Sequence, residues 1–232
     1  CVHCLKGEYA WCSIMRVDGG GYGEYSLGFQ HQCVPLPKTV SLDDGALVEP
    51  MAVGLHGVRL AQSQPGDRVL IIGAGPIGLA AAYWARRLGA GRIAVTAGST
   101  RRASLALTMG ADVFLDPADA SPEAASRALG GMPDVVYECV GVPGMISRCI
   151  DYVRPRGTVI VLGLCSKQDH FMPFTLVAKE ARLQASAFYD RRDFEVCADA
   201  LDKDADTQRA MVTDVIHLED MPPVFESLRQ RT

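Results

Sequence analysis

Three closely spaced glycines offer the clearest chemistry in this sequence. Gly73, Gly75 and Gly78 form a Gly-x-Gly-x-x-Gly motif directly after the apolar run 69–72, and apolar residues then recur at helical spacing as far as Leu88. In a dinucleotide-binding turn the first glycine permits a tight bend, the second leaves room for a pyrophosphate, and the third lets helix and strand pack closely. The helix would point free N–H groups and the positive end of its dipole at the phosphates. We therefore predict that this turn binds a dinucleotide through Gly73, Gly75, Pro76, Ile77 and Gly78.

The end of the second expected strand bears on which dinucleotide is bound. An NAD site usually has an acidic residue there, which bonds the adenine-ribose hydroxyls, whereas this sequence has Ala97. Ser99, Arg101 and Arg102 follow and could donate hydrogen bonds to a 2′-phosphate, which an acidic residue would repel. The alternative is that the two arginines only decorate a solvated helix start. We expect NADP rather than NAD, with Ala97, Ser99, Arg101 and Arg102 at its adenine-ribose end.

Three of the eight cysteines, Cys1, Cys4 and Cys12, lie within the first twelve residues. Thiolates in such a short loop suit a structural zinc, which takes four tetrahedral ligands and stabilises a segment too small for its own core. A Cys-x-x-Cys redox pair is disfavoured because no strand-to-helix pattern surrounds the loop. Three incidental cysteines are the other alternative. The single cysteines in apolar runs are predicted to be core residues, and no histidine is assigned a catalytic role.

The elements that must position these residues alternate along the chain. Apolar runs separated by helical stretches of about ten residues indicate a parallel sheet with helices on both faces. The predicted fold class is α/β, with a doubly wound, parallel, six-stranded Rossmann sheet. Its expected strands are 69–72, 92–96, 112–115, 134–139, 158–164 and 183–189. Outside the sheet we expect strands at 25–29, 31–37 and 212–216 and helices at 45–61, 194–201 and 223–228.

The composition of the chain argues against several classes of function. Its 232 residues are 48% hydrophobic and carry a formal net charge of −4, so no basic field would attract nucleic acid or an anionic membrane. The apolar stretch 69–85 is too short for a membrane span and contains a glycine turn and a proline. The cysteine pattern does not suit a secreted disulfide framework. We expect a cytoplasmic protein that acts on a small molecule, without a nucleic-acid or membrane partner.

Several motifs run in order through almost the whole chain. They are Cys1-x-x-Cys4-x-x-Gly7-x4-Cys12, Gly20-x-x-x-Glu24-Tyr25, Asp44-Gly45-Ala46-Leu47-Val48-Glu49-Pro50, Val69 to Gly78, Glu138-Cys139-Val140-Gly141 and Val161-Leu162-Gly163-Leu164. In type and spacing they resemble the medium-chain zinc-dependent alcohol dehydrogenases, and within them the sorbitol (polyol) dehydrogenase-like branch. The resemblance implies zinc-assisted hydride transfer between a secondary alcohol or polyol, or its ketone, and NAD(P).

The resemblance also implies roles for particular residues and parts of the chain. In the polyol branch, the residue matching Glu49 faces the catalytic zinc, as a ligand or through bound water, although an ordinary acid in an early helical turn is an equal alternative. Main chain at the carboxyl ends of the last three strands meets ribose and nicotinamide, which corresponds to Val140, Gly141, Leu162, Gly163, Leu164, Ala187 and Phe188. Three parts follow: residues 1–45 as the remnant of a GroES-like, β-rich catalytic domain with the structural-zinc loop, 46–188 as the Rossmann domain, and 189–232 as the return to the catalytic domain.

The sequence departs from the family pattern near its beginning. The first of four cysteines on the structural-zinc loop would lie before Cys1, and the upstream Cys and His-Glu ligands of the catalytic zinc are absent. We therefore expect a piece of a longer enzyme, which the resemblance implies is a homodimer or homotetramer. The alternatives are a zinc-free, quinone-type reductase of the same superfold, a non-catalytic nucleotide-binding module and, more remotely, a methyltransferase.

Overall fold

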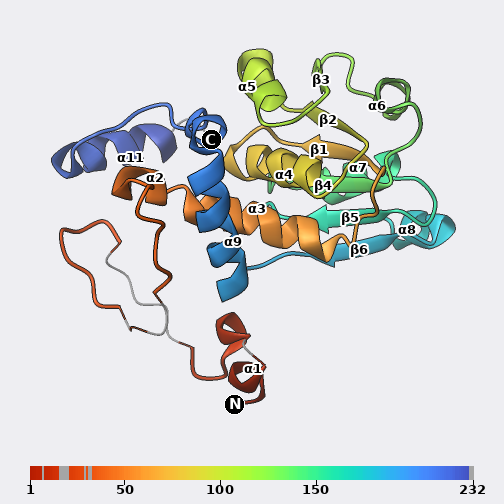
Figure 1. Cartoon of the computed structure of the whole chain (residues 1–232). Coiled ribbons are helices and arrows are strands. Elements are labelled where there is room, and N and C mark those ends of the chain that lie inside the picture. Colours follow the sequence, from red (N-terminus) through yellow and green to blue (C-terminus); the bar gives the residue numbers. More distant parts are fainter. Residues whose placement is uncertain (7, 16–20, 29, 31–32, 230–232) are drawn as a thin grey trace.

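A parallel sheet of six strands forms the centre of the molecule, in the order β3-β2-β1-β4-β5-β6 (Figure 1). The structure is a computed structural model and describes residues 1–229 except 7, 16–20, 29 and 31–32. The strands are β1 Arg68–Ile72, β2 Arg92–Thr96, β3 Val113–Leu115, β4 Val135–Glu138, β5 Thr158–Val161 and β6 Arg182–Ala185. Since β1 pairs with β2 on one side and β4 on the other, the strand order reverses at β1. Ligands of open α/β sheets bind outside the carboxyl ends of the strands at such a point.

Both faces of the central strands of the sheet are buried. In β1, Val69 and Ile71 belong to one hydrophobic core, whereas Leu70 and Ile72 belong to a second core on the opposite face. This alternation follows from the two-residue period of a strand, and it confirms the predicted doubly wound sheet. The first core is covered by α3 Val48–Leu60, α4 Pro76–Arg87, α5 Ala103–Thr108 and α9 Arg191–Lys203. The second is covered by α6 Pro122–Leu129, α7 Met145–Tyr152 and α8 Pro173–Lys179.

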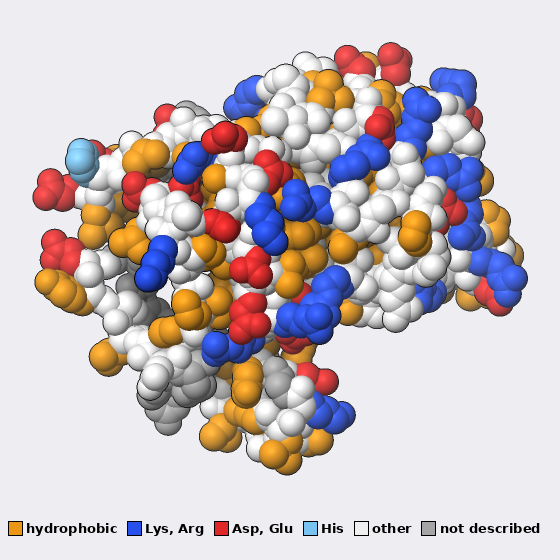
Figure 2. Space-filling view, in the orientation of Figure 1, with side chains coloured by type: hydrophobic (Ala, Val, Ile, Leu, Met, Phe, Trp, Pro, Cys, Tyr) orange, Lys and Arg blue, Asp and Glu red, His pale blue; other side chains and the backbone are white. Residues whose placement is uncertain are grey.

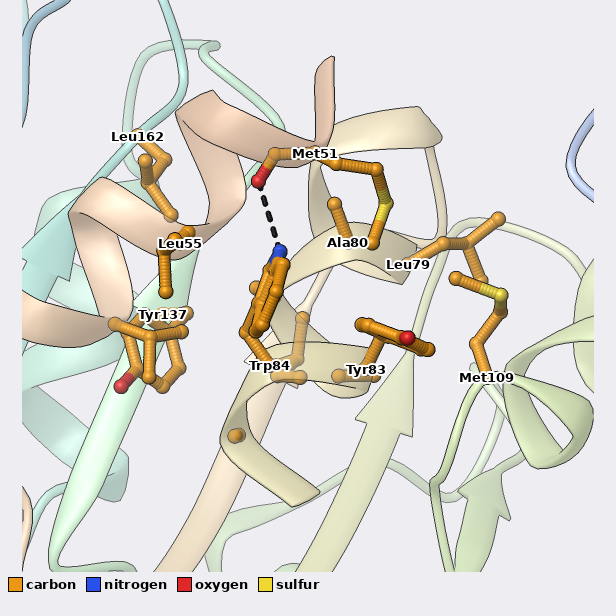
Figure 3. Close-up of a cluster of buried hydrophobic side chains, with 14 of the residues drawn as sticks. Met51, Leu55, Leu79, Ala80, Tyr83, Trp84, Met109, Tyr137 and Leu162 are labelled. Atoms are coloured by element: carbon orange, nitrogen blue, oxygen red, sulfur yellow. Dashed lines mark hydrogen bonds between the residues drawn. The ribbon is translucent and has the colours of Figure 1, made fainter. Parts of the chain in front are cut away.

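A buried indole joins the two helices nearest the glycine turn. The Trp84 ring on α4 lies against α3, and its Nε1 donates a 2.9 Å hydrogen bond to the Met51 carbonyl oxygen (Figure 3). A buried Trp N–H needs such a partner, and the ring itself supplies a large apolar area. Leu79 and Ala80 extend the same cluster from the first turns of α4. The start of α4 is therefore fixed by the core beneath it.

Outside the sheet, α3, α9 and α11 Met221–Arg229 confirm the predicted helices, but the predicted strands are not confirmed. The expected strands are absent from the described residues 25–28, 33–37 and 212–216. Tyr25 and Leu27 are almost fully exposed, and an extended segment becomes a strand only where another strand accepts its hydrogen bonds. α3 forms most of the helix expected over 45–61, and α2 Leu42–Gly45 precedes it as a separate short helix. The remaining elements are short: α1 Val2–Leu5, η1 Tyr9–Trp11, η3 Thr100–Arg102, α10 Ala205–Arg209 and η4 Leu218–Asp220.

The last two strands end earlier than the sequence suggests. β5 stops at Val161 because Leu162 and Gly163 both turn to donate to the Glu138 carbonyl oxygen, at 2.8 and 3.0 Å. β6 stops at Ala185, so Ala187 and Phe188 lie in the loop beyond it. Among the described residues, no helix has the length and apolar character needed to cross a membrane. The division of the chain into the three predicted parts stays a prediction.

Candidate functional site

The glycine turn lies at the carboxyl end of β1 and opens α4. Gly73 has φ +115°, and a side chain there would come within 2.7 Å of the Cys139 carbonyl oxygen. A side chain on Gly78 would overlap the Gly73 carbonyl oxygen. Pro76 occupies the first turn of α4, where its missing N–H has no intrahelical partner to lose. The turn therefore has the predicted strand-to-helix geometry, with the N-terminus of α4 available to an anion.

The Arg102 side chain reaches back across this turn. Its Nη1 donates a 3.0 Å hydrogen bond to the Ala74 carbonyl oxygen, and the same nitrogen lies 4.0 Å from the position that a Gly75 side chain would occupy. Ala97 follows β2 directly, and Ser99 immediately precedes the short helix η3. Ser99 and Arg101 are exposed, whereas Arg102 is half-buried. The structure thus brings Arg102 to the turn, while Arg101 and Ser99 lie on the surface beside it.

The carboxyl ends of β4 and β5 meet closely. Gly141 has φ +74°, and a side chain on it would come within 2.7 Å of the Leu164 amide nitrogen. A cavity of about 400 Å³ opens at the ends of β5 and β6. Its lining includes two of the predicted nicotinamide residues, Gly163 and Leu164, together with Cys165 and Ser186. A second hollow of about 500 Å³ is lined by residues 117–121 and Arg127, none of which was predicted to be in a site.

Phe188 lies two residues after Ser186, which lines the cavity at the ends of β5 and β6. Its φ of +59° is unusual for an aromatic residue. Its ring meets the Trp11 ring edge-on, with centroids 5.5 Å apart. The contact brings the cysteine-bearing loop to the turn after β6, which the sequence alone did not indicate.

Glu49 lies in the first turn of α3 and is exposed. Its carboxylate faces Tyr189, a neighbour that the sequence analysis missed because nothing in the sequence relates two residues so far apart. Burial, followed by the charge of Glu49 and a hydrogen bond to it, raises the pKa of Tyr189 to about 12. Glu49 belongs to none of the groups of three potential metal ligands found among the described residues.

The three N-terminal cysteines form a cluster. The sulfur atoms of Cys1, Cys4 and Cys12 all lie within 4.8 Å of one another, and the first two are 3.6 Å apart. A main-chain hydrogen bond from Ile14, followed by a bond from the Cys4 thiol, lowers the pKa of Cys12. Bonding to Cys12, followed by burial, raises the pKa of Cys4. Sulfur ligands of one tetrahedral zinc lie just under 4 Å apart, as Zn–S bonds of about 2.3 Å require, so the three thiols fit three of its ligand positions.

His56, Asp190 and Asp193 form a second group of potential metal ligands, but their side chains are already bonded to other groups of the protein. Asp193 is fully buried; it accepts a 3.0 Å hydrogen bond from His56 Nδ1, and it pairs with Arg59. Burial opposes ionisation, but the bonds from His56, the Asp190 main chain and Arg59 together lower the pKa of Asp193. These bonds join α3 to α9.

The single cysteines agree in part with their predicted core roles. Cys149 and Cys197 are fully buried, and burial raises the pKa of both thiols strongly. Burial, with help from the Glu138 carboxylate, also raises the pKa of Cys139. Cys165 differs because it lines the cavity at the end of β5. Its thiol donates to the Lys167 carbonyl oxygen at 3.4 Å.

Comparison with known proteins gives a consistent result. Residues 76–203 match the family model described as zinc-binding dehydrogenase. Sorbitol dehydrogenase from Ovis aries is 40% identical over 139 residues, which cover 58% of this chain and 39% of that enzyme. The crystal structure of L-idonate 5-dehydrogenase from Escherichia coli superposes with a TM-score of 0.90 at 28% identity, covering 100% of this chain and 69% of that one. A zinc-binding dehydrogenase from Sinorhizobium meliloti bound to NADP has a TM-score of 0.79 at 28% identity, with 93% and 70% covered. The chain spans 39 to 57% of the length of the first curated relatives it matches.

Proposed function

The chain belongs to the zinc-dependent medium-chain alcohol dehydrogenase family, and from this premise we propose that it is the cofactor-binding part of an NADP-dependent dehydrogenase. The whole protein would transfer a hydride between a secondary alcohol or polyol, or its ketone, and the nicotinamide. The observation that carries the proposal is the glycine turn at the strand-order reversal, with the Arg102 guanidinium beside it. Sorbitol and L-idonate, named for two relatives, indicate the class of substrate.

The glycine turn and α4 would hold the pyrophosphate. The first N–H groups of α4 have no intrahelical acceptors, and the helix dipole adds a positive potential at the same point. Gly75 leaves the approach open because it has no side chain. The buried packing of Leu79 and Trp84 holds the helix start in position, so the site is formed before a ligand arrives.

The preference for NADP is supported by the residues after β2. Ala97 has no carboxylate to bond the ribose hydroxyls or to repel a 2′-phosphate. Arg102 offers a planar guanidinium that has used one donor on the Ala74 carbonyl and keeps others for a phosphate. Arg101 and Ser99 lie beside it on the surface as further donors.

The nicotinamide half would lie over the carboxyl ends of β4, β5 and β6. The bound nicotinamide supplies the hydride chemistry, and the protein orients it. We propose that main chain at Val140, Gly141, Leu162, Gly163, Leu164, Ala187 and Phe188 does so. The cavity lined by Gly163 and Leu164 is the space next to these groups.

The two zinc sites implied by the family differ in how well this chain fits them. Cys1, Cys4 and Cys12 suit a structural zinc that needs one further ligand. Glu49 is not grouped with other metal-binding side chains in the part of the chain that the structure describes. We therefore assign no reaction step to a catalytic zinc here. We propose only that the Glu49–Tyr189 pair lies on the side of the cofactor site where the catalytic zinc of the whole enzyme would be held.

Titration with NADPH and with NADH, followed by nicotinamide fluorescence, tests the cofactor proposal. We expect tighter binding of NADPH, and we expect Arg102→Ala to weaken NADPH binding on the order of tenfold while changing NADH binding little. Arg92→Ala is the control because Arg92 lies exposed at the opposite end of β2. Equal losses for both cofactors would mean that Arg102 only supports the Ala74 carbonyl, and equal wild-type affinities would contradict the NADP assignment.

We further propose that the protein is cytoplasmic and that it self-associates as a dimer or tetramer. β6 is the last strand of the sheet, and among the described residues one of its edges has no neighbouring strand. Leu164, Phe174 and Val177, near this edge, are at least 70% exposed, and large exposed apolar side chains are characteristic of interfaces. Light scattering of wild type and Val177→Asp tests this: the variant should have the lower mass, and a monomeric wild type would contradict the proposal.

A further inference from the structure

Glu138 is a buried acid at the end of the central strand β4, and the sequence analysis gave it no role. Only 2% of its surface is exposed. Its Oε1 accepts hydrogen bonds from the main-chain N–H groups of Val140 and Gly141, at 2.7 and 2.9 Å. Its carbonyl oxygen accepts from Leu162 and Gly163 at the end of β5. One residue therefore holds both of the main-chain turns that we assign to the nicotinamide half.

The two turns approach each other too closely for side chains. A side chain on Gly163 would overlap both the Gly141 amide nitrogen and Glu138 Oε2. A side chain on Gly141 would come within 2.7 Å of the Leu164 amide nitrogen. Because the glycines have no side chains, their main chain packs directly against the Glu138 carboxylate.

The negative charge of Glu138 is not neutralised locally. None of the ion pairs found among the described residues includes it, and both of its hydrogen-bond donors are neutral amides. Its charge contributes to the raised pKa of the Cys139 and Cys149 thiols. A buried charge with little water around it acts over a longer range than a surface charge.

We propose that Glu138 sets which redox form of the cofactor the site prefers. The oxidised nicotinamide ring carries a positive charge and the reduced ring does not, so a buried carboxylate beneath the ring favours the oxidised form. Glu138 is a positioning residue for the two turns and, through its charge, a determinant of the balance between NADP⁺ and NADPH. The inference rests on the proposed function, since it requires the nicotinamide to lie over β4 and β5.

The test separates charge from position by measuring the dissociation constants of NADP⁺ and NADPH for the same protein samples. Glu138→Gln keeps an oxygen that can accept from Val140 and Gly141 but removes the charge. We expect it to raise the ratio Kd(NADP⁺)/Kd(NADPH) on the order of tenfold. Glu138→Asp keeps the charge but shortens the side chain, so we expect it to weaken both forms while leaving the ratio within about twofold of wild type.

Asp134→Asn is the matched control because Asp134 directly precedes β4, about 13 Å from Glu138 along the strand. This variant also removes one partly buried negative charge, but that charge is far from Glu138. The ratio Kd(NADP⁺)/Kd(NADPH) should therefore stay at the wild-type value. NAD⁺ and NADH are measured in the same way, which makes the result independent of the 2′-phosphate. A ratio in Glu138→Gln equal to that in wild type would overturn the inference while leaving the proposed function standing. Failure of wild type to bind any of the four dinucleotides would overturn both.

Discussion

The N-terminal segment, residues 1–28, and the sheet with its helices use apolar side chains in opposite ways. Ile71, Ile93 and Ile160 in the sheet are fully buried, whereas Leu5 and Leu27 in the segment are at least 90% exposed. Figure 2 shows several apolar side chains on the lobe at the bottom of the view, where Figure 1 places α1. Strands and helices alternate only in the sheet region, so each apolar face there meets another. Apolar composition alone therefore does not create a core; paired elements do.

Truncation of one isoleucine or leucine in each region should give the largest contrast. Ile71→Ala removes a side chain with no exposed surface, so we expect a loss of about 2 to 5 kcal/mol in the free energy of unfolding. Leu27→Ala should change it by less than about 0.5 kcal/mol, because that side chain already meets solvent. Urea titration followed by circular dichroism measures both values. A loss of several kcal/mol for Leu27→Ala would show that the segment is packed in solution.

Zinc should stabilise the N-terminal segment without changing the sheet. In wild type, zinc should slow amide hydrogen exchange at residues 1–15, and a chelator should reverse the effect. Cys12→Ser should weaken zinc binding on the order of 100-fold, about 2.7 kcal/mol, because a hydroxyl is a poor ligand for this metal. Cys165→Ser, outside the cluster, is the control and should bind zinc as wild type does. Equal zinc affinity in the two variants would show that the cluster is not the site.

The two regions also differ in how far the sequence predicted them. The glycine turn was predictable because strand, turn and helix are consecutive, so residues 69–88 specify their own geometry. The strands predicted at 25–29 and 31–37 are absent from the described residues of these ranges, since a strand depends on a partner that its own residues do not encode. Glu138 had a visible signal, a charge ending an apolar run, but its hold on β5 appears only in three dimensions.

Acid should destabilise the sheet through Asp134, which bonds Arg68 and Arg154. Burial opposes ionisation, but the bonds from Arg68 and then Arg154 lower the pKa of Asp134 from 3.8 to about 2. Because the folded pKa is the lower one, this contribution is complete above about pH 4 and is lost as the pH falls towards about 2. Asp134→Asn should therefore cost about 1 to 2 kcal/mol at pH 7, after allowance for solvent screening, and this cost should shrink below about pH 4.

The N-terminal segment offers the matching acid for this experiment. Glu8 pairs with His3 at 2.8 Å, but both side chains are more than 40% exposed. Glu8→Gln should therefore change the free energy of unfolding by less than about 0.5 kcal/mol. Thermal unfolding of both variants between pH 2 and pH 7 makes the comparison. A pH-independent cost for Asp134→Asn would mean that the carboxylate charge is not what stabilises this end of β4.

The smallest expected effect concerns the aromatic contact between the two regions. Trp11 meets Phe188 edge-on, and such pairs contribute about 1 kcal/mol beyond the area that they bury. Trp11→Ala should therefore speed hydrogen exchange in residues 1–15 while leaving the exchange of β1 and β4 unchanged, because the sheet has its own core. Tyr9→Ala is the control, since Tyr9 is 53% exposed in the same short helix. If Trp11→Ala also speeds exchange in β1, the segment and the sheet unfold as one unit, and the contrast between them holds for packing but not for cooperativity.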